Sequence, residues 1–351
     1  MTPVRIAPWT FGSMVLVCTV CLTPLTLDQV FIRAAGEGTL LWLLLAAMFS
    51  LLGVHIGARL VDAPLTGWAT RVSDALRYPR ALFYILGAGF MLNGWLSVVT
   101  ATSLSRTPRL AIAILSLTVV VYVLRLGLES TARFIGFLGL IVGFSIAVIL
   151  TMNMFKVDFS YLLPHPLGTG AVPWLWPAII FSPRGYDVIA PFASHTDPGW
   201  RRPAYLGVGI GALLDMVALI LPVLMLGYPA ASQDSATLLH ALGTFSSTYL
   251  PFQRFGFAVL LTWQLNSAAV VSLYSIATLA SLKVQLAPLT PWPAVGGVAL
   301  SVLALSLSVM SPDMNAIVIN VWSVFGLLLF VALPVLLLSM GKRTRRQPAP
   351  A

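Results

Sequence analysis

The chain has 351 residues, of which 58% are hydrophobic and 9% are charged, and its mean hydropathy is +0.93. Because soluble globular domains normally carry about 25% charged residues, this composition excludes a water-soluble fold and indicates a protein of the lipid bilayer. The chain has 20 Lys and Arg against 11 Asp and Glu, but the basic residues lie in short segments beside apolar runs. That distribution favours a role in membrane topology over nucleic-acid binding.

The apolar runs predict helices and not the strands of a membrane barrel. They continue for about 20 residues without alternation, the length of a helix that crosses about 30 Å of hydrocarbon, whereas barrel strands alternate over about 10 residues. We therefore expect an all-α integral membrane protein with about ten transmembrane helices. The predicted spans are 9–30, 39–57, 81–103, 109–126, 133–153, 173–193, 204–227, 255–281, 292–311 and 316–340.

The first span is interrupted near its middle by Thr19, Thr23 and Pro24. Proline removes a backbone hydrogen bond, so a break in the helix is expected there. Cys18 and Cys21 lie in the same span at C-x-x-C spacing, but no second pair of Cys or His residues accompanies them. We therefore interpret them as buried helix residues and predict neither a metal site nor a cofactor.

The loops indicate which end of each span faces the cytoplasm. Residues 65–76 are weakly amphipathic and predict a segment at the membrane interface, and residues 341–351 form a basic tail. If both chain termini are cytoplasmic, most of the Lys and Arg residues fall on the inner side, as the positive-inside rule requires. The long loop 227–253 carries no Lys or Arg and is then external, with a short helix expected around 235–242. The basic residues assigned to the outer side are Arg33, Arg106, Arg109, Lys156 and Arg254.

The sixth span carries a second break, at 181–187 (FSPRGYD), which begins five spans after the first. Breaks at corresponding places in two halves are typical of transporters built from inverted repeats, with the binding site at the broken helices. A half-helix N-terminus offers N–H groups to a carboxylate, and freed carbonyl groups hold an ammonium group or a cation. We therefore expect one membrane domain of two repeats, 1–153 and 173–340. A kink that neighbouring Ser and Thr residues repair is the alternative, and the first break alone would favour it.

Polar residues deep in other spans complete the candidate site. Asp215 is ionisable and lies well inside the seventh span, so it is either functional or paired with Arg184. Asn93, Asn266 and Ser267 are polar at similar depth, and interhelical hydrogen bonding is the alternative role for each. The candidate substrate-binding residues are Thr19, Thr23, Pro24, Asn93, Ser182, Arg184, Gly185, Tyr186, Asn266 and Ser267, and the candidate coupling or structural charges are Asp187 and Asp215.

Three stretches resemble a known family in their order and spacing. They are 127–133 (GLESTAR), 157–164 (VDFSYLLP) and 185–192 (GYDVIAPF). Together they are similar to the permease-like B subunit of spore germinant receptors, of the amino acid–polyamine–organocation superfamily.

The resemblance implies a LeuT-like fold with five plus five helices, and a subunit that senses a small germinant such as an amino acid. It also implies a spore inner membrane or cell membrane location and two partners, a larger A-type membrane subunit and a C-type lipoprotein. A secondary transporter of an amino acid or amine is the alternative function, because signalling and transport can use the same pocket. The chain has no G-x-S-x-G or H-E-x-x-H motif, so we do not expect an enzyme.

Overall fold

The computed structural model describes residues 5–21, 32, 39–63, 68–102, 104–153, 157–162, 184–233, 255–286, 290–308 and 312–344. These residues are almost entirely helical. Short turns and 3-10 segments join the longer helices, among them η3 (Phe159–Leu162), α9 (Ile189–Phe192) and η5 (Ala193–His195). The longer helices are α1 (Pro8–Cys21), α3 (Thr39–Asp62), α4 (Trp68–Ala75), α5 (Arg77–Thr102), α6 (Arg109–Arg125), α7 (Leu128–Asn153), α10 (Arg201–Leu226), α11 (Tyr228–Gln233), α13 (Phe255–Ser281), α14 (Trp292–Ser306), α15 (Pro312–Leu327) and α16 (Leu333–Thr344).

The predicted spans agree with these helices where both are described. Within the described residues, five helices are long and apolar enough to cross a membrane, and two further apolar helices are shorter. The expected interfacial segment at 65–76 contains α4, and a π-helical turn at Leu328–Ala332 joins α15 to α16. The rest of the first predicted span after Cys21, the sixth span up to Pro183, and the expected helix at 235–242 lie outside the described residues.

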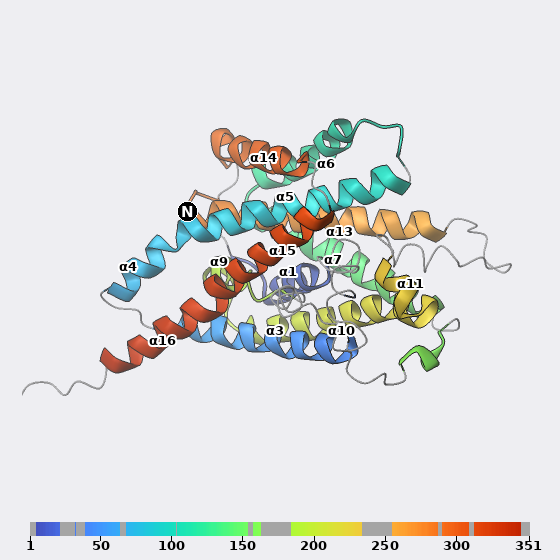
Figure 1. Ribbon diagram of the computed structural model, residues 1–351. Helices are drawn as coiled ribbons and strands as arrows, with labels where there is room; N and C mark the ends of the chain where they lie inside the picture. The colour runs from blue at the N-terminus through green and yellow to red at the C-terminus, as the bar shows by residue number, and fades with distance from the viewer. Residues whose placement is uncertain are drawn as a thin grey trace, which may run out of the picture.

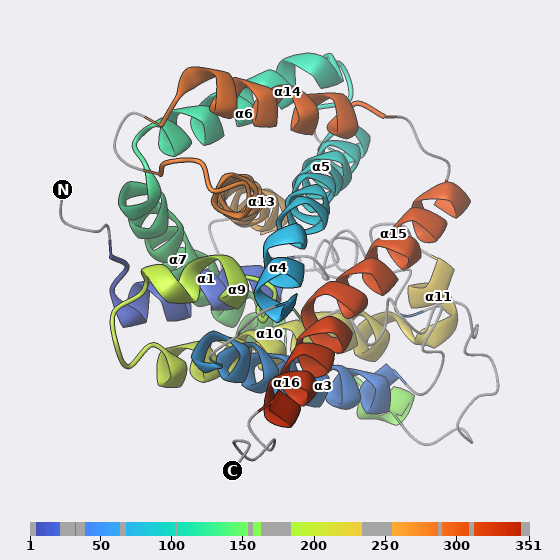
Figure 2. The same ribbon diagram turned by 90° about the vertical axis from the view of Figure 1, so that its left-hand side faces the viewer.

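The helices pack in layers around two central ones. α5 and α13 run side by side through the middle, with α6 and α14 along one flank and α3 and α10 along the other (Figures 1 and 2). α1 packs against α10, α7 and α13, while α15 and α16 lean across the remaining side. α1 is apolar all round, as expected of a helix that neighbours enclose, and Phe11, Met14 and Cys18 are fully buried.

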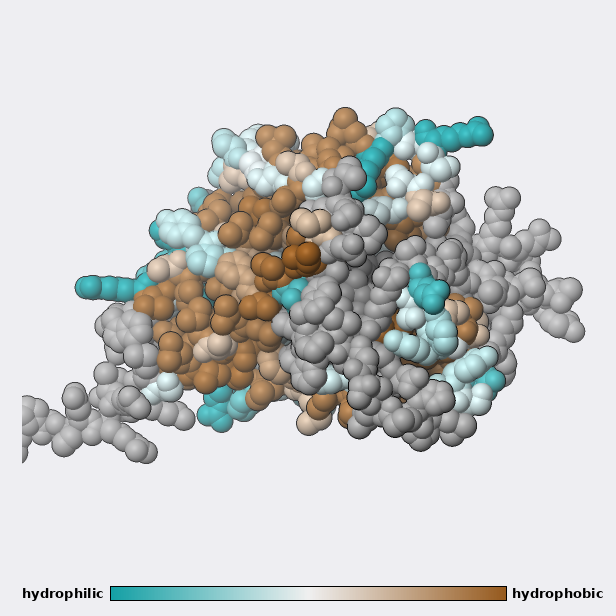
Figure 3. Space-filling model, in the orientation of Figure 1, coloured by the Kyte–Doolittle hydropathy of each residue, from teal (hydrophilic) through white to brown (hydrophobic). Residues whose placement is uncertain are grey.

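The outer surface is apolar where it would meet lipid. Leu115, Phe144 and Leu300 are each at least two-thirds exposed. In Figure 3 hydrophobic side chains cover much of the left half of the visible face, and hydrophilic ones lie mainly toward its edges. A broad exposed apolar belt of this kind is typical of a protein whose solvent is the bilayer.

Glycines allow α1 and α10 to approach closely. A Cβ atom on Gly207 would lie 2.4 Å from the carbonyl oxygen of Gly12, and one on Gly211 would lie 2.7 Å from Cβ of Thr19. Small residues permit such contacts between membrane helices. Gly209 lies between them in sequence but has nothing within 4 Å of its Cβ position, so it does not contribute to this contact.

Three ion pairs gather at one end of the helix bundle. Arg201 pairs with Asp62, Lys283 pairs with Asp74 at 2.8 Å, and Arg5 pairs with Asp197 at 3.4 Å. This is the end where α3 stops, α5 and α10 start and α16 finishes (Figure 1). The segments that the charge distribution assigns to the cytoplasm therefore lie together.

The orientation can be tested with topology reporters. Reporters inserted within 71–80 or fused after Lys342 are expected on the cytoplasmic side, and one inserted within 232–244 on the outer side, because the basic segments should stay inside. The measurement is the activity of a compartment-specific fusion enzyme. A reporter on the opposite side would change the parity of the later spans and remove the correspondence between the two breaks.

Candidate functional site

The first component of the site is the C-terminal half of α1, which meets the segment after Pro183. The Thr19 hydroxyl lies 2.8 Å from the carbonyl oxygen of Val15 and 2.9 Å from that of Arg184, so it can donate to either. The second contact joins two segments that are far apart in sequence. It also satisfies a backbone carbonyl that stands outside any helix, as a buried polar group requires.

Gly185 allows the chain to turn at this point. Its φ is +101°, a conformation that residues with a Cβ rarely adopt. A Cβ atom there would lie 2.3 Å from Oγ1 of Thr19 and 3.0 Å from the carbonyl oxygen of Val15. Glycine is therefore required twice, by the backbone angle and by the contact with α1.

Asp187 ties this turn to two other helices through its carboxylate. Oδ1 accepts from the Gly185 N–H at 3.2 Å and from the Cys18 thiol at 3.4 Å, and Oδ2 accepts from the Tyr274 hydroxyl at 2.8 Å. The Tyr84 hydroxyl donates to the backbone carbonyl of Asp187 at 2.6 Å. All of these groups are buried. We refer to Cys18, Tyr84, Asp187 and Tyr274 as the Asp187 cluster, which links α1, α5 and α13 to the break.

Arg184 points toward α15. Its side chain is fully buried, and its Cζ atom lies 3.6 Å from the centre of the Trp322 ring, a cation–π arrangement. The Trp322 indole donates to the backbone carbonyl of Phe83 at 3.0 Å and stacks on the Phe83 ring at 4.9 Å. The sequence left open whether Arg184 pairs with Asp215; the structure places the Arg184 guanidinium on an aromatic surface formed by α5 and α15.

Tyr186 packs on α3. A Cβ atom on Gly53 would lie 2.5 Å from Cγ of Tyr186, and the Phe49 ring meets the tyrosine ring edge-on at 6.3 Å. Tyr186 also lines a cavity of about 220 Å³ between α3, α5, α9 and the π-helical turn. Among the predicted site residues that are described, it is the one beside a sizeable open volume.

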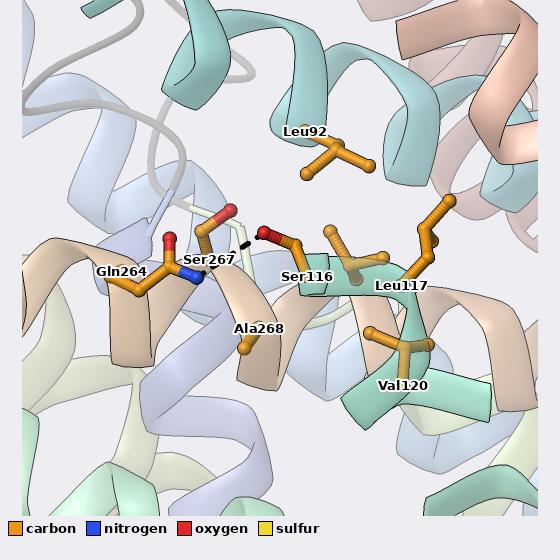
Figure 4. Close-up of a pocket in the computed structure, with 8 residues that line it drawn as sticks. Leu92, Ser116, Leu117, Val120, Gln264, Ser267 and Ala268 are labelled. Carbon is orange, nitrogen blue, oxygen red and sulfur yellow. Dashed lines mark hydrogen bonds between the residues drawn. The ribbon is translucent and has the colours of Figure 1, made fainter. Parts of the chain in front are cut away.

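α13 carries several more polar residues, and one of them makes a contact with a neighbouring helix. The Gln264 amide donates to the Ser116 hydroxyl on α6 at 3.3 Å, and Ser267 points into the same gap (Figure 4). The gap does not admit a water molecule. Gln264 and Ser116 therefore have the packing role that was the alternative for polar residues in these spans.

Asn266 presents a complete amide in the same helix. It is fully buried, and neither its amide nitrogen nor its amide oxygen has a hydrogen-bond partner among the described residues, whereas the neighbouring Gln264 and Ser267 each have one such unpartnered atom. An unpartnered buried polar group costs about 1–3 kcal/mol, and an amide presents both a donor and an acceptor. Asn266 is thus an energetically unfavourable residue for a helix interior unless something else binds there.

The other predicted residues lie in different places. The Asn93 amide donates to the carbonyl oxygens of Ser306 and Ser308, at 3.1 and 2.7 Å, so it caps the end of α14 away from the Asp187 cluster. Asp215 is fully buried on α10, one turn beyond Gly211, which touches Thr19. The remaining predicted residues, Thr23, Pro24 and Ser182, lie outside the described residues.

Sequence reasoning missed three residues of this site. Cys18 was correctly predicted to be buried but not to contact Asp187, and Tyr84 and Tyr274 were not singled out. A usable signal existed for the tyrosines, because a hydroxyl in the middle of an apolar span needs a buried partner. It does not identify which partner, since Asp187 is distant in sequence from both.

Comparisons with known proteins find one matching family model and solved structures of similar fold. The family model Spore_permease, described as "Spore germination protein", matches residues 5–286. The fold is similar to that of a Na⁺-coupled sialic acid symporter solved in a substrate-bound, outward-open state, with a TM-score of 0.53 over 96% of this chain and 77% of that chain. The two sequences are 13% identical, so the likeness concerns the fold alone. No curated protein matches the sequence significantly.

Proposed function

Because this chain belongs to the spore germination permease family, we propose that it is the membrane subunit of a spore germinant receptor. Family and fold establish a multi-pass, permease-like membrane protein of the LeuT-like class. The proposal adds that the chain binds a small germinant, such as an amino acid, at its broken helices and signals to partner subunits. The proposal also places the protein in the spore inner membrane or cell membrane, with both termini cytoplasmic. It further assigns the spans to two inverted repeats.

The observation that carries the proposal is the unpartnered amide of Asn266. It lies eight residues before Tyr274 on α13, which corresponds to about 12 Å along the helix axis. The Asp187 cluster would then form the inner floor of a site and Asn266 part of its wall. An amide can donate to a carboxylate and accept from an ammonium group, the two charged ends of an amino acid.

The breaks supply the other contacts in this proposal. Thr23, Pro24 and Ser182 would contribute backbone groups, as half-helix ends do for charged ligands. Asp215 faces α1 and is the candidate for an ammonium group or a coupling ion. Asp187 already accepts from three donors of its own chain, which supports a structural role for its charge.

Asn266→Leu replaces the amide by an apolar side chain of similar size. The ligand-free protein should keep or gain stability, by up to about 1–3 kcal/mol, because a buried unsatisfied group is removed. Germinant affinity should fall about tenfold or more, since a lost hydrogen bond to a charged group is worth about 1.5–3 kcal/mol. Thermal unfolding of the purified chain, with and without a panel of amino acids, nucleosides and sugars, measures both effects.

Gln264→Leu is the matched control, because it lies on the same helix and its amide nitrogen already has a partner in Ser116, while its carbonyl oxygen has none. It should change stability little, since one hydrogen bond and one unsatisfied atom are lost together, and leave ligand affinity unchanged. If Asn266→Leu binds the ligand of the wild-type chain equally well, or if no member of the panel shifts the unfolding of the wild-type chain, the proposed site is wrong.

A secondary transporter of an amino acid or amine is the second candidate, and the symporter fold favours it. A receptor subunit must transmit its signal to a neighbour, the proposed A-type subunit or C-type lipoprotein, and contacts within the membrane are the route that these apolar helices offer. Co-purification from spore membranes should then recover these partners. Recovery of the chain alone, with accumulation of a labelled amino acid in reconstituted vesicles, would establish the transporter instead.

A further inference from the structure

The cavity beside Tyr186 has a composition that the germinant site does not explain. It measures about 220 Å³ and lies between α3, α4, the start of α5, the segment after Tyr186 and the π-helical turn. Its walls are mainly apolar, with Leu60 and Phe330 among them, and Ser73 and Ser194 supply hydroxyl groups. Among the described residues of the lining, Arg80 is the charged one, and no Asp or Glu accompanies it.

Arg80 has no carboxylate partner among the described residues. It forms no ion pair with any of them, and its Nε atom is buried without a hydrogen-bond partner. At the same end of the bundle, Lys283 and Arg201 are paired with carboxylates, while Arg77 contacts the Tyr78 ring and hydroxyl. Burying a charged group is unfavourable unless a partner compensates it. An anion in the cavity would supply that partner.

We propose that this cavity binds an anionic group, a phosphate or a carboxylate, that is attached to an apolar body. The guanidinium group presents a planar set of donors that fits either anion, and the serine hydroxyls can add hydrogen bonds. The aliphatic and aromatic walls accommodate the apolar part. A free amino acid fits poorly, because no carboxylate in the lining receives its ammonium group.

Two sources can supply this chemistry, a soluble organic anion and the headgroup of an anionic phospholipid. The cavity is lined by Leu60, Ser73 and Arg80, near the ends of α3 and α4 and the start of α5, which is the end of the bundle where the ion pairs lie. Its occupant would touch Tyr186, the residue directly before Asp187. Binding there would therefore favour one arrangement of the break, independently of the germinant.

The test uses the purified full-length chain in a neutral detergent. Hexyl phosphate and hexanoate are the soluble probes, hexanol is their uncharged control, and phosphatidylglycerol against phosphatidylcholine tests the lipid source. Arg80→Gln removes the charge but keeps hydrogen-bonding capacity. Arg77→Gln is the matched control, since Arg77 lies one turn earlier on α5 and contacts Tyr78.

We expect at least one anionic probe to bind the wild-type chain about tenfold or more tightly than Arg80→Gln, while Arg77→Gln binds like wild type. Native mass spectrometry and thermal shift report the binding. Preference for phosphatidylglycerol alone identifies a lipid headgroup, and preference for hexyl phosphate or hexanoate identifies a soluble anion.

The proposal is overturned if hexanol binds the wild-type chain as well as the anions do, or if no anionic probe binds. Both outcomes are measured on the wild-type chain, so they do not depend on whether a variant folds. If Arg80→Gln does not fold, Arg80→Lys takes its place: it keeps the charge and should retain weaker binding. Loss of germinant binding in the Asn266 variant would leave these results unchanged, so the two proposals fail separately.

Discussion

Replacing Gly185 by alanine is expected to lower the free energy of unfolding by about 2–4 kcal/mol. A positive φ costs about 1–2 kcal/mol for a residue with a Cβ, and overpacking against a buried neighbour adds about 1–3 kcal/mol. The neighbours here are Thr19 and the backbone of Val15, both in the buried half of α1. Neither neighbour can move away from the added Cβ atom without a shift of α1 against α10. The shift of the thermal unfolding midpoint in detergent measures the loss.

Gly209→Ala is the control for this prediction. Gly209 lies within α10, its Cβ position has open space around it, and its backbone is helical. Alanine should therefore raise stability by about 0.5–1 kcal/mol. Equal effects of the two substitutions would show that the contact between the break and α1 does not hold the fold together.

The second large effect is expected at Asp187. Asp187→Ala removes the acceptor of the Gly185 N–H, the Cys18 thiol and the Tyr274 hydroxyl. Unfolding free energy should fall by about 3–5 kcal/mol, because each buried donor left without an acceptor costs about 1–3 kcal/mol and a small void is added. Asp187→Asn keeps one carbonyl oxygen and should lose about half as much.

A double-mutant cycle with Tyr274→Phe separates the roles of the carboxylate. If Asp187 anchors the break, the losses of Asp187→Ala and Tyr274→Phe should be less than additive, because both remove the same hydrogen bond. Chemical or thermal unfolding of the four proteins gives the coupling energy. Should Asp187→Asn instead abolish ligand binding with unchanged stability, Asp187 would act on the ligand or a coupling ion directly.

The sequence predicted the membrane class, the helices and their approximate limits. These follow from local properties, since the length of an apolar run decides whether a helix can cross the bilayer, and lipid requires every backbone group to be paired within the segment. The break around Gly185 was predictable because it too follows from local properties of the chain. Proline and glycine act on their own backbone, and the observed φ of +101° is the consequence.

The partners of the polar residues depended on the tertiary structure. Asn93 and Asn266 look alike in sequence, as single amides in apolar spans, yet the first caps α14 and the second has no partner. Arg184 lies on Trp322, and Asp187 binds Cys18 and Tyr274. Hydrophobicity indicates which segments enter the membrane but not how each helix is rotated. That rotation is set by packing between helices, such as the glycine contacts of α1 with α10, and it decides which polar groups meet.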